Sequence, residues 1–172
     1  MKTRFYYSGL AVLTIFLLLA FQGKVNAQRR GTIWAKDGYQ YYKVNAGGID
    51  ELDARDASKK TAIVTKEMLT PQGKTPLAIS GFSFSEDGNK VLIFTNTKRV
   101  WRYNTRGDYW VYDIAAKSLK QLGNGKPESS MMFAKISPDG NKAAYVSGHN
   151  IYVEDLASGE ITPMTTDGTP RL

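Results

Sequence analysis

A short polar turn recurs in this 172-residue chain and constrains the fold more than any other feature. Residues 84–94 read FSEDGNKVLIF, and residues 136–146 read ISPDGNKAAYV. In both copies an Asp-Gly-Asn turn joins two apolar runs, and Gly and Asn accept the positive φ angles that a tight reversal needs. Each copy therefore predicts a β-hairpin. A hairpin cannot bury its apolar face alone, so a repeat at this period predicts an array of similar β-units.

Alternating apolar residues and turn residues predict strands and almost no helix in the rest of the chain. Residues 32–34 and 39–44 flank a Lys-Asp-Gly turn at residues 36–38 and predict a third, looser hairpin. Each of the three hairpins is followed by a strand that closes on an aspartate, a polar turn and a fourth strand. The closing aspartates are Asp56, Asp113 and Asp155, and the polar turns are residues 57–60, 115–118 and 156–159.

The expected fold class is all-β: an incomplete β-propeller of about three four-stranded antiparallel blades, at residues 32–66, 81–122 and 133–165. Residues 68–76, which hold two prolines, are interpreted as a connector between blades. Propellers close with typically four to eight blades. We therefore expect residues 28–172 to be the N-terminal part of a larger, truncated propeller domain.

The first 27 residues have the composition of an export signal. Lys2 and Arg4 precede an apolar run from about residue 9 to 21, and residues 25–27 offer small side chains to a signal peptidase. The run is shorter than the roughly 20 apolar residues that span a bilayer. We expect residues 1–27 to be a signal peptide and the chain to be exported, to the periplasm or the cell surface. An uncleaved signal that leaves the protein membrane-associated is the alternative.

Composition and motifs exclude several kinds of site. The net charge is +7, but outside the signal the basic residues form only isolated pairs, so we expect no nucleic-acid partner. The absence of cysteine excludes disulfides and thiolate metal sites. The single histidine, His149, lies in a predicted turn, and no Gly-x-Ser-x-Gly nucleophile elbow occurs. The carboxylate pairs Asp50-Glu51 and Glu86-Asp87 are interpreted as turn residues. We therefore expect no catalytic residue, no metal and no cofactor in this chain.

The second unit carries an insertion between its second and third strands. Asp87 and Asp139 are 52 positions apart, whereas Asp113 and Asp155 are only 42 apart, so the second unit has about ten extra residues, within 95–107. We expect a loop on one rim, where repeat proteins place binding groups. The insertion holds Trp101, Tyr103, Arg99, Arg102 and Arg106.

Two interpretations of this insertion stay open. Guanidinium groups offer planar forks of donors that suit a carbonyl or carboxylate partner. Alternatively, the aromatic residues only fasten a long hairpin while the arginines face water. Spacing alone does not show which arginine would bind a partner.

Residues 100–104, VWRYN, and residues 109–113, YWVYD, resemble a known family. They are similar to the aromatic-arginine hairpin and the Tyr-x-(Ile/Val)-Tyr-Asp strand of the dipeptidyl peptidase IV N-terminal domain, in the prolyl oligopeptidase family. The resemblance covers most of residues 32–172, and the signal fits exported bacterial members. Val100 and Tyr103 stand where mammalian members carry polar residues. Arg99 or Arg106 would replace Arg102 if the hairpin register differed.

The resemblance implies a function for a longer protein. In that family an eight-bladed propeller caps an α/β-hydrolase domain of the same polypeptide, and this serine-type peptidase releases Xaa-Pro dipeptides from peptides with a free N-terminus. The catalytic Ser, Asp and His belong to the hydrolase domain, and the glutamates that bind the substrate amine lie beyond Leu172. This fragment would therefore be inactive alone.

The resemblance also implies a site and partners. Arg102 matches the propeller arginine that contacts the substrate backbone, and the full-length protein could form a homodimer. The alternative is a non-enzymatic TolB-like periplasmic propeller that binds a protein partner, because such propellers share the Ser-x-Asp-Gly turns.

Overall fold

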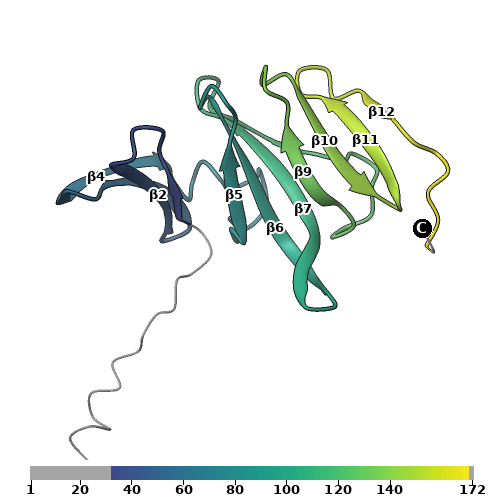
Figure 1. The fold of residues 1–172 in the computed structure, drawn as a ribbon, viewed down its shortest axis with the longest axis horizontal. Coiled ribbons are helices and arrows are strands. Elements are labelled where there is room, and N and C mark those ends of the chain that lie inside the picture. Colours follow the sequence, from purple (N-terminus) through teal and green to yellow (C-terminus); the bar gives the residue numbers. More distant parts are fainter. Residues whose placement is uncertain (1–31, 171–172) are drawn as a thin grey trace, which may run out of the picture. The chain divides into compact units, whose positions relative to one another are not determined.

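The computed structural model describes residues 32–170, and this range contains strands and turns but no helix. Twelve strands form three antiparallel sheets of four strands, and each sheet is built from strands that follow one another in the sequence. The sheets begin and end within about two residues of the predicted units (Figure 1). The all-β, incomplete propeller architecture is thereby confirmed. The predicted signal peptide lies outside the described residues, and within them no helix has the length and apolar character needed to cross a membrane.

The first sheet contains β1 (Thr32–Trp34), β2 (Gln40–Asn45), β3 (Gly48–Asp53) and β4 (Asp56–Val64), in that order. One predicted turn is wrong here. Asp56 opens β4 instead of closing β3, and residues 57–60 lie inside β4. The chain turns after Asp53, three residues earlier than predicted. Asp53 stabilises this turn because it accepts hydrogen bonds from the backbone N–H of Arg55 at 2.9 Å and from its guanidinium at 2.7 and 3.0 Å.

The second and third sheets carry the repeated turn, which is confirmed in both. A serine hydroxyl donates to the carboxylate of an aspartate, and that carboxylate accepts the backbone N–H of an asparagine at 3.1 Å. The residues are Ser85, Asp87 and Asn89 in the second sheet and Ser137, Asp139 and Asn141 in the third. The strands are β5 (Gly81–Phe84), β6 (Lys90–Val100), β7 (Tyr103–Asp113) and β8 (Ser118–Gln121), then β9 (Met132–Ile136), β10 (Lys142–Ser147), β11 (Asn150–Asp155) and β12 (Ile161–Pro163).

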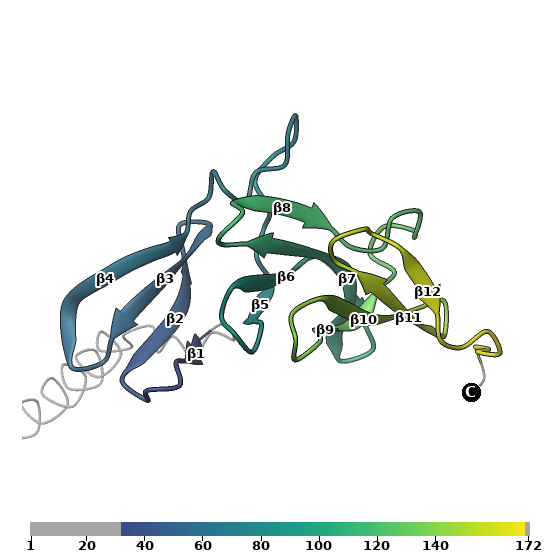
Figure 2. The ribbon, with the colours of Figure 1, turned by 90° about the horizontal axis from the view of Figure 1, so that it is seen from above.

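Successive sheets lie side by side and bury apolar residues between them (Figure 2). Strand β6 contributes to both cores because its side chains alternate: Val91 and Ile93 face the first sheet, and Leu92 faces the third. The second sheet is therefore covered on both faces and supports the outer parts of β6 and β7, which extend from it. The first core contains Ile49, Val64, Leu69, Val91, Ile93, Trp110 and Tyr112, and the second contains Leu92, Tyr109, Val111, Leu122, Met131, Ala134, Ala143 and Tyr145.

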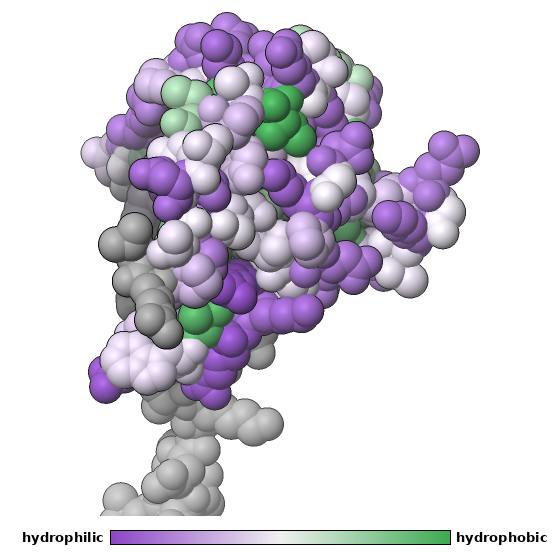
Figure 3. Space-filling model, turned by 90° about the vertical axis from the view of Figure 1, so that its right-hand side faces the viewer, coloured by the Kyte–Doolittle hydropathy of each residue, from purple (hydrophilic) through white to green (hydrophobic). Residues whose placement is uncertain are grey.

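The connectors between sheets belong to these cores. Leu69, in the segment between β4 and β5, is fully buried, as are Leu122 and Met131 in the segment between β8 and β9. The prediction that residues 68–76 connect two blades is thus confirmed. Seen from the side of the third sheet, the surface is mostly hydrophilic, with separate apolar spots (Figure 3). The large apolar side chains that this sheet exposes include Phe133 and Ile151.

Candidate functional site

The insertion in the second unit forms a long hairpin of paired strands and not the expected loop. Strands β6 and β7 are 11 residues long, whereas β10 and β11 of the third sheet are 6 residues long. This difference accounts for the extra residues. The outer half of the hairpin runs beyond the ends of the neighbouring strands (Figure 1). Its cross-strand register shifts between Thr95 and Lys98 and again between Lys98 and Arg99, so β-bulges interrupt the ladder there.

The predicted site residue Arg102 lies in the tip of this hairpin. Val100 pairs with Tyr103, and Trp101 and Arg102 form the two-residue connection between them. Trp101 has φ of 58° and its side chain is 83% exposed. A positive φ at the first central position of a two-residue hairpin turn is normally taken by glycine, because a side chain there costs roughly 1–2 kcal/mol. A bulky residue in this conformation is an observation that points to function.

The guanidinium of Arg102 stacks on Trp101. Its Cζ lies 4.5 Å from the centre of the Trp101 ring, which is within the range of a cation–π contact. In such a stack the ring covers one face of the guanidinium, while the N–H groups at its edge stay available to a ligand. The tip therefore presents a fork of hydrogen-bond donors at a turn between two paired strands.

Three residues that sequence reasoning missed hold the base of the hairpin. The buried carboxylate of Asp108 accepts the backbone N–H of Ser129 at 2.6 Å and the side-chain amide of Asn96 at 2.7 Å. The Ser129 hydroxyl in turn donates to the Asn96 carbonyl at 2.6 Å. Beside them Gly107 and Met131 exchange both backbone hydrogen bonds, at 3.0 and 3.2 Å. The connector that leads to the third sheet therefore clamps the hairpin at its base, and no local sequence signal marks this contact.

The other candidates from the sequence do not join this site. His149 lies in the two-residue turn between β10 and β11, as predicted. Glu86 and Asp87 lie in the β5–β6 turn, as predicted, but Asp50 and Glu51 lie inside β3, so their interpretation as turn residues is wrong. Asp50 is buried because its carboxylate pairs with Lys60 at 2.9 Å and accepts the Asn45 amide at 2.7 Å. No group of three potential metal ligands occurs among residues 32–170.

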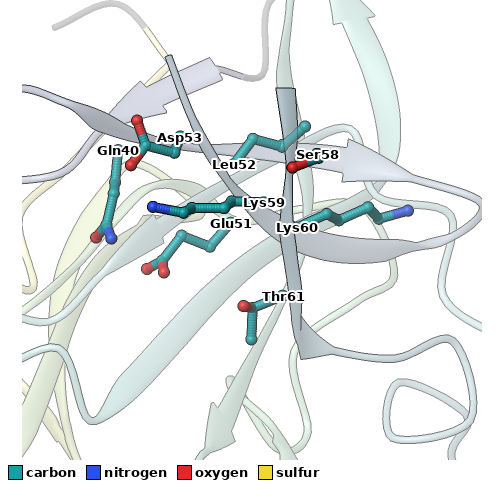
Figure 4. Close-up of a pocket in the computed structure, with 8 residues that line it drawn as sticks. All are labelled: Gln40, Glu51, Leu52, Asp53, Ser58, Lys59, Lys60 and Thr61. Atoms are coloured by element: carbon teal, nitrogen blue, oxygen red, sulfur yellow. The ribbon is translucent and has the colours of Figure 1, made fainter. Parts of the chain in front are cut away.

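An open hollow lies on one face of the first sheet. Figure 4 shows the side chain of Lys59 extending between Asp53, Gln40 and Glu51, whereas Lys60 points away from them. Asp53 is engaged by Arg55, whose guanidinium and backbone N–H hold the pKa of this carboxyl well below its usual range. The hollow joins carboxylates to ammonium groups, and the Ser58 hydroxyl on its lining donates to the exposed Asp56 carboxylate at 2.6 Å. Its lining includes no residue of the β6–β7 hairpin.

Comparison with known proteins identifies the family. The model of the dipeptidyl peptidase IV (DPP IV) N-terminal region matches residues 85–172, about half of the chain, and this range includes the whole β6–β7 hairpin. The chain belongs to the DPP IV N-terminal family. This result decides between the two families considered from the sequence, in favour of DPP IV and against a TolB-like propeller.

Individual relatives of this DPP IV N-terminal chain agree with the family match. The probable dipeptidyl-aminopeptidase B of Aspergillus niger is 29% identical over 124 residues, which are 70% of this chain and 14% of the relative. The probable dipeptidyl-aminopeptidase B of Penicillium rubens is 31% identical over 125 residues, which are 73% of this chain and 13% of the relative. The chain thus spans about one seventh of the length of these curated relatives.

A solved structure supports the fold of the DPP IV N-terminal chain. The crystal structure of Porphyromonas gingivalis dipeptidyl peptidase 4 matches with a TM-score of 0.67 and 23% identity, over 81% of this chain and 20% of that protein. At this identity the match shows the fold alone.

Proposed function

We propose that this chain is the N-terminal propeller portion of a serine-type dipeptidyl peptidase that releases Xaa-Pro dipeptides from the N-termini of peptides. In this proposal the propeller shapes substrate access and supplies Arg102 as a substrate-binding residue. The nucleophile and its acid and base come from an α/β-hydrolase domain of the same polypeptide. The chain itself supplies no catalytic residue and would be inactive alone.

The exposed, stacked guanidinium at the hairpin tip is the observation that carries this proposal. Because the Trp101 ring lies against the Arg102 guanidinium, the cation has fewer orientations to lose when it meets a ligand. A peptide carbonyl is an acceptor that suits such a donor fork. Holding the first residues of a peptide in this way would position its scissile bond next to a nucleophile. Binding would then lower the activation free energy of the reaction.

Arg102 is favoured over the two other arginines of the hairpin by position. Arg99 and Arg106 lie along the strands, opposite Asn104 and Lys98 respectively, whereas Arg102 lies in the turn. Neither Arg99 nor Arg106 has a ring stacked on it among the contacts of the described residues. The observed pairing of Val100 with Tyr103, which leaves Arg102 in the turn, supports this choice.

The proposal also includes a place in the cell and an assembly. Residues 1–27 would direct export as a signal peptide, to the periplasm or cell surface, and the full-length protein could act as a homodimer. The basis for export is the sequence of the first 27 residues, with two basic residues before an apolar run.

Steady-state kinetics of the complete gene product on a Gly-Pro chromogenic substrate test this function. Arg102→Ala should lower kcat/KM about tenfold to a hundredfold, the range expected when a hydrogen bond from a charged group is lost. Arg102→Lys should recover part of the loss, because it restores the charge but not the planar fork. The matched control Arg99→Ala should change kcat/KM less than about twofold. Equal rates for Arg102→Ala and the parent protein, with the thermal midpoint unchanged, would reject the assignment of Arg102.

A further inference from the structure

Two cations lie directly opposite one another on the β6–β7 hairpin. Lys98 and Arg106 are register partners, both exposed, in the outer half of the hairpin. Side chains that are directly opposed across an antiparallel pair lie about 5 Å apart at their Cβ atoms and face the same side. Like charges in this arrangement destabilise the ladder. The hairpin therefore keeps a locally unfavourable pair.

No carboxylate in the described residues relieves this repulsion. The ion pairs of residues 32–170 use Lys36, Arg55, Lys60 and Lys90 as their cations. Lys90 lies at the base of the hairpin, and no cation of the outer half takes part in an ion pair within these residues. The sequence from residue 96 to 107 contains four basic residues and no acidic one. The nearest acid along the chain, Asp108, is buried and is already engaged by Ser129 and Asn96.

Apolar surface continues from the charge pair towards the tip. Val100 lies two positions from Lys98 on β6, so the two share a side of the strand. Its register partner Tyr103 comes to the same side as Arg106 because the bulge between Lys98 and Arg99 adds one residue to β7. Val100 and Tyr103 are 38% and 55% exposed. One face therefore presents two cations beside a β-branched and an aromatic side chain. A peptide segment that carries both carboxylate and apolar side chains is complementary to such a face.

We propose that the face formed by Lys98, Val100, Tyr103 and Arg106 binds acidic side chains of the peptide, downstream of the residues held at Arg102. The inference rests on the proposed function and adds a preference for acidic substrates to it. A peptide fits this face better than a membrane or a nucleic acid does, since two cations on a narrow ribbon neutralise few phosphates.

Competition among three peptides in the complete gene product tests the proposal. The peptides Gly-Pro-Glu-Glu-Gly, Gly-Pro-Gln-Gln-Gly and Gly-Pro-Lys-Lys-Gly differ only after the cleaved bond. At about 20 mM salt, kcat/KM should be about threefold to tenfold higher for the acidic than for the neutral peptide, and lowest for the basic one. The preference should shrink at about 500 mM salt, because exposed charges are then screened.

Two double variants test whether the preference for the acidic peptide comes from this face or from the overall charge of the protein. Lys98→Gln/Arg106→Gln should abolish the preference for the acidic peptide while kcat/KM for the neutral peptide stays within about twofold. Its thermal midpoint should be equal or higher, because the opposed charges are gone. Lys43→Gln/Lys135→Gln removes the same charge from exposed strand positions on the other two sheets and should keep the preference.

The outcomes separate this inference from the proposed function. If no peptide loses a dipeptide, the proposed function fails, and fluorescence anisotropy of a labelled Glu-rich peptide then tests the face alone. Binding that Lys98→Gln/Arg106→Gln removes would support the face. Three results would each overturn the proposed role of this face. They are equal rates for the three peptides, equal binding by both double variants, and binding only to anionic lipid vesicles or polyphosphate.

Discussion

Glu154 of the third sheet accepts the backbone N–H of Gly123 at 2.8 Å, although the two residues are 31 positions apart. The carboxylate is 1% exposed, and its second partner is the Tyr145 hydroxyl at 3.3 Å. Burial raises the pKa of Tyr145, and the nearby Glu154 carboxylate raises it further, so the phenol remains a donor across the ordinary pH range. This contact fastens the connector that follows β8 to the next sheet.

Replacing Glu154 by leucine should therefore destabilise the protein. The substitution leaves two buried donors without an acceptor, which costs about 2–4 kcal/mol in the free energy of unfolding. Glu154→Gln keeps one oxygen that can accept the Gly123 N–H and should cost less than half as much. Urea unfolding followed by circular dichroism measures both, with the exposed Glu160→Leu as control. A loss below about 1 kcal/mol for Glu154→Leu would contradict this account.

Asp108 should control both stability and the placement of the hairpin. Asp108→Ala removes the acceptor for Ser129 and Asn96, and we expect a loss of about 2–3 kcal/mol. Faster amide hydrogen exchange at Ser129 and along the outer hairpin should accompany it, because the base clamp opens. Asn104→Ala serves as the control, since it removes only an exposed 2.9 Å hydrogen bond to Thr97. Exchange rates that match those of the control would show that Asp108 does not hold the hairpin.

Trp101→Gly should separate binding from stability. Glycine accepts the φ of 58° without strain but also adds freedom to the unfolded chain, so the free energy of unfolding should change by less than about 1 kcal/mol. The substitution also removes the ring on which Arg102 stacks. We expect kcat/KM of the complete gene product on a Gly-Pro substrate to fall about threefold to tenfold, since exposed cation–π contacts are modest. Trp101→Phe should keep most of the rate, and a Trp101→Gly enzyme as active as the parent would contradict the role of the stack.

The repeated turns should make stability sensitive to acid. The Ser85 hydroxyl, followed by the backbone and side chain of Asn89, lowers the pKa of Asp87 to about 2. The Ser137 hydroxyl and the Asn141 backbone likewise lower the pKa of Asp139. Because the folded-state pKa values lie below the unfolded value of about 3.9, this stabilisation is complete above pH 4 and is lost as the pH falls towards 2.

Thermal midpoints between pH 5 and pH 2 measure this effect. Asp87→Asn/Asp139→Asn should show a shallower fall below pH 4 than the parent, because asparagine can still accept the turn hydrogen bonds but does not titrate. At pH 5 the double variant should be folded and somewhat less stable. Parallel curves for the two proteins would mean that other carboxyl groups dominate the acid response.

Much of the fold follows from local pattern. The serine, aspartate and asparagine of each repeated turn lie within four residues of one another, so their hydrogen bonds form in any copy of the motif. Alternation of side chains then assigns Val91 and Leu92 to opposite faces. For this reason the sequence predicted the three four-stranded sheets, the connector at residues 68–76 and the length of the insertion.

The errors occur where the local sequence allows more than one assignment of turns and strands. Asp53 and Asp56 are both able to close a turn, and the side chain of Arg55 decides in favour of Asp53. Asp50 and Glu51 look like turn residues because paired carboxylates are uncommon inside a strand. Asp50 is nevertheless buried in one, since Asn45 and Lys60 engage its carboxylate. The insertion was expected to be a loop because insertions in repeat proteins usually are, whereas its strands stay paired across two bulges.

The sequence by itself determined the all-β architecture, the family and the position of the arginine-bearing insertion, because each depends on residues near one another in the chain. Whether Arg102 binds a substrate stays a prediction. Only the tertiary structure decided that Trp101 supports the Arg102 guanidinium, that Lys98 faces Arg106, and that Asp108 and Glu154 fasten the connector between the second and third sheets. These contacts depend on strand register and on hydrogen bonds across 21 and 31 positions, which packing and not local propensity selects.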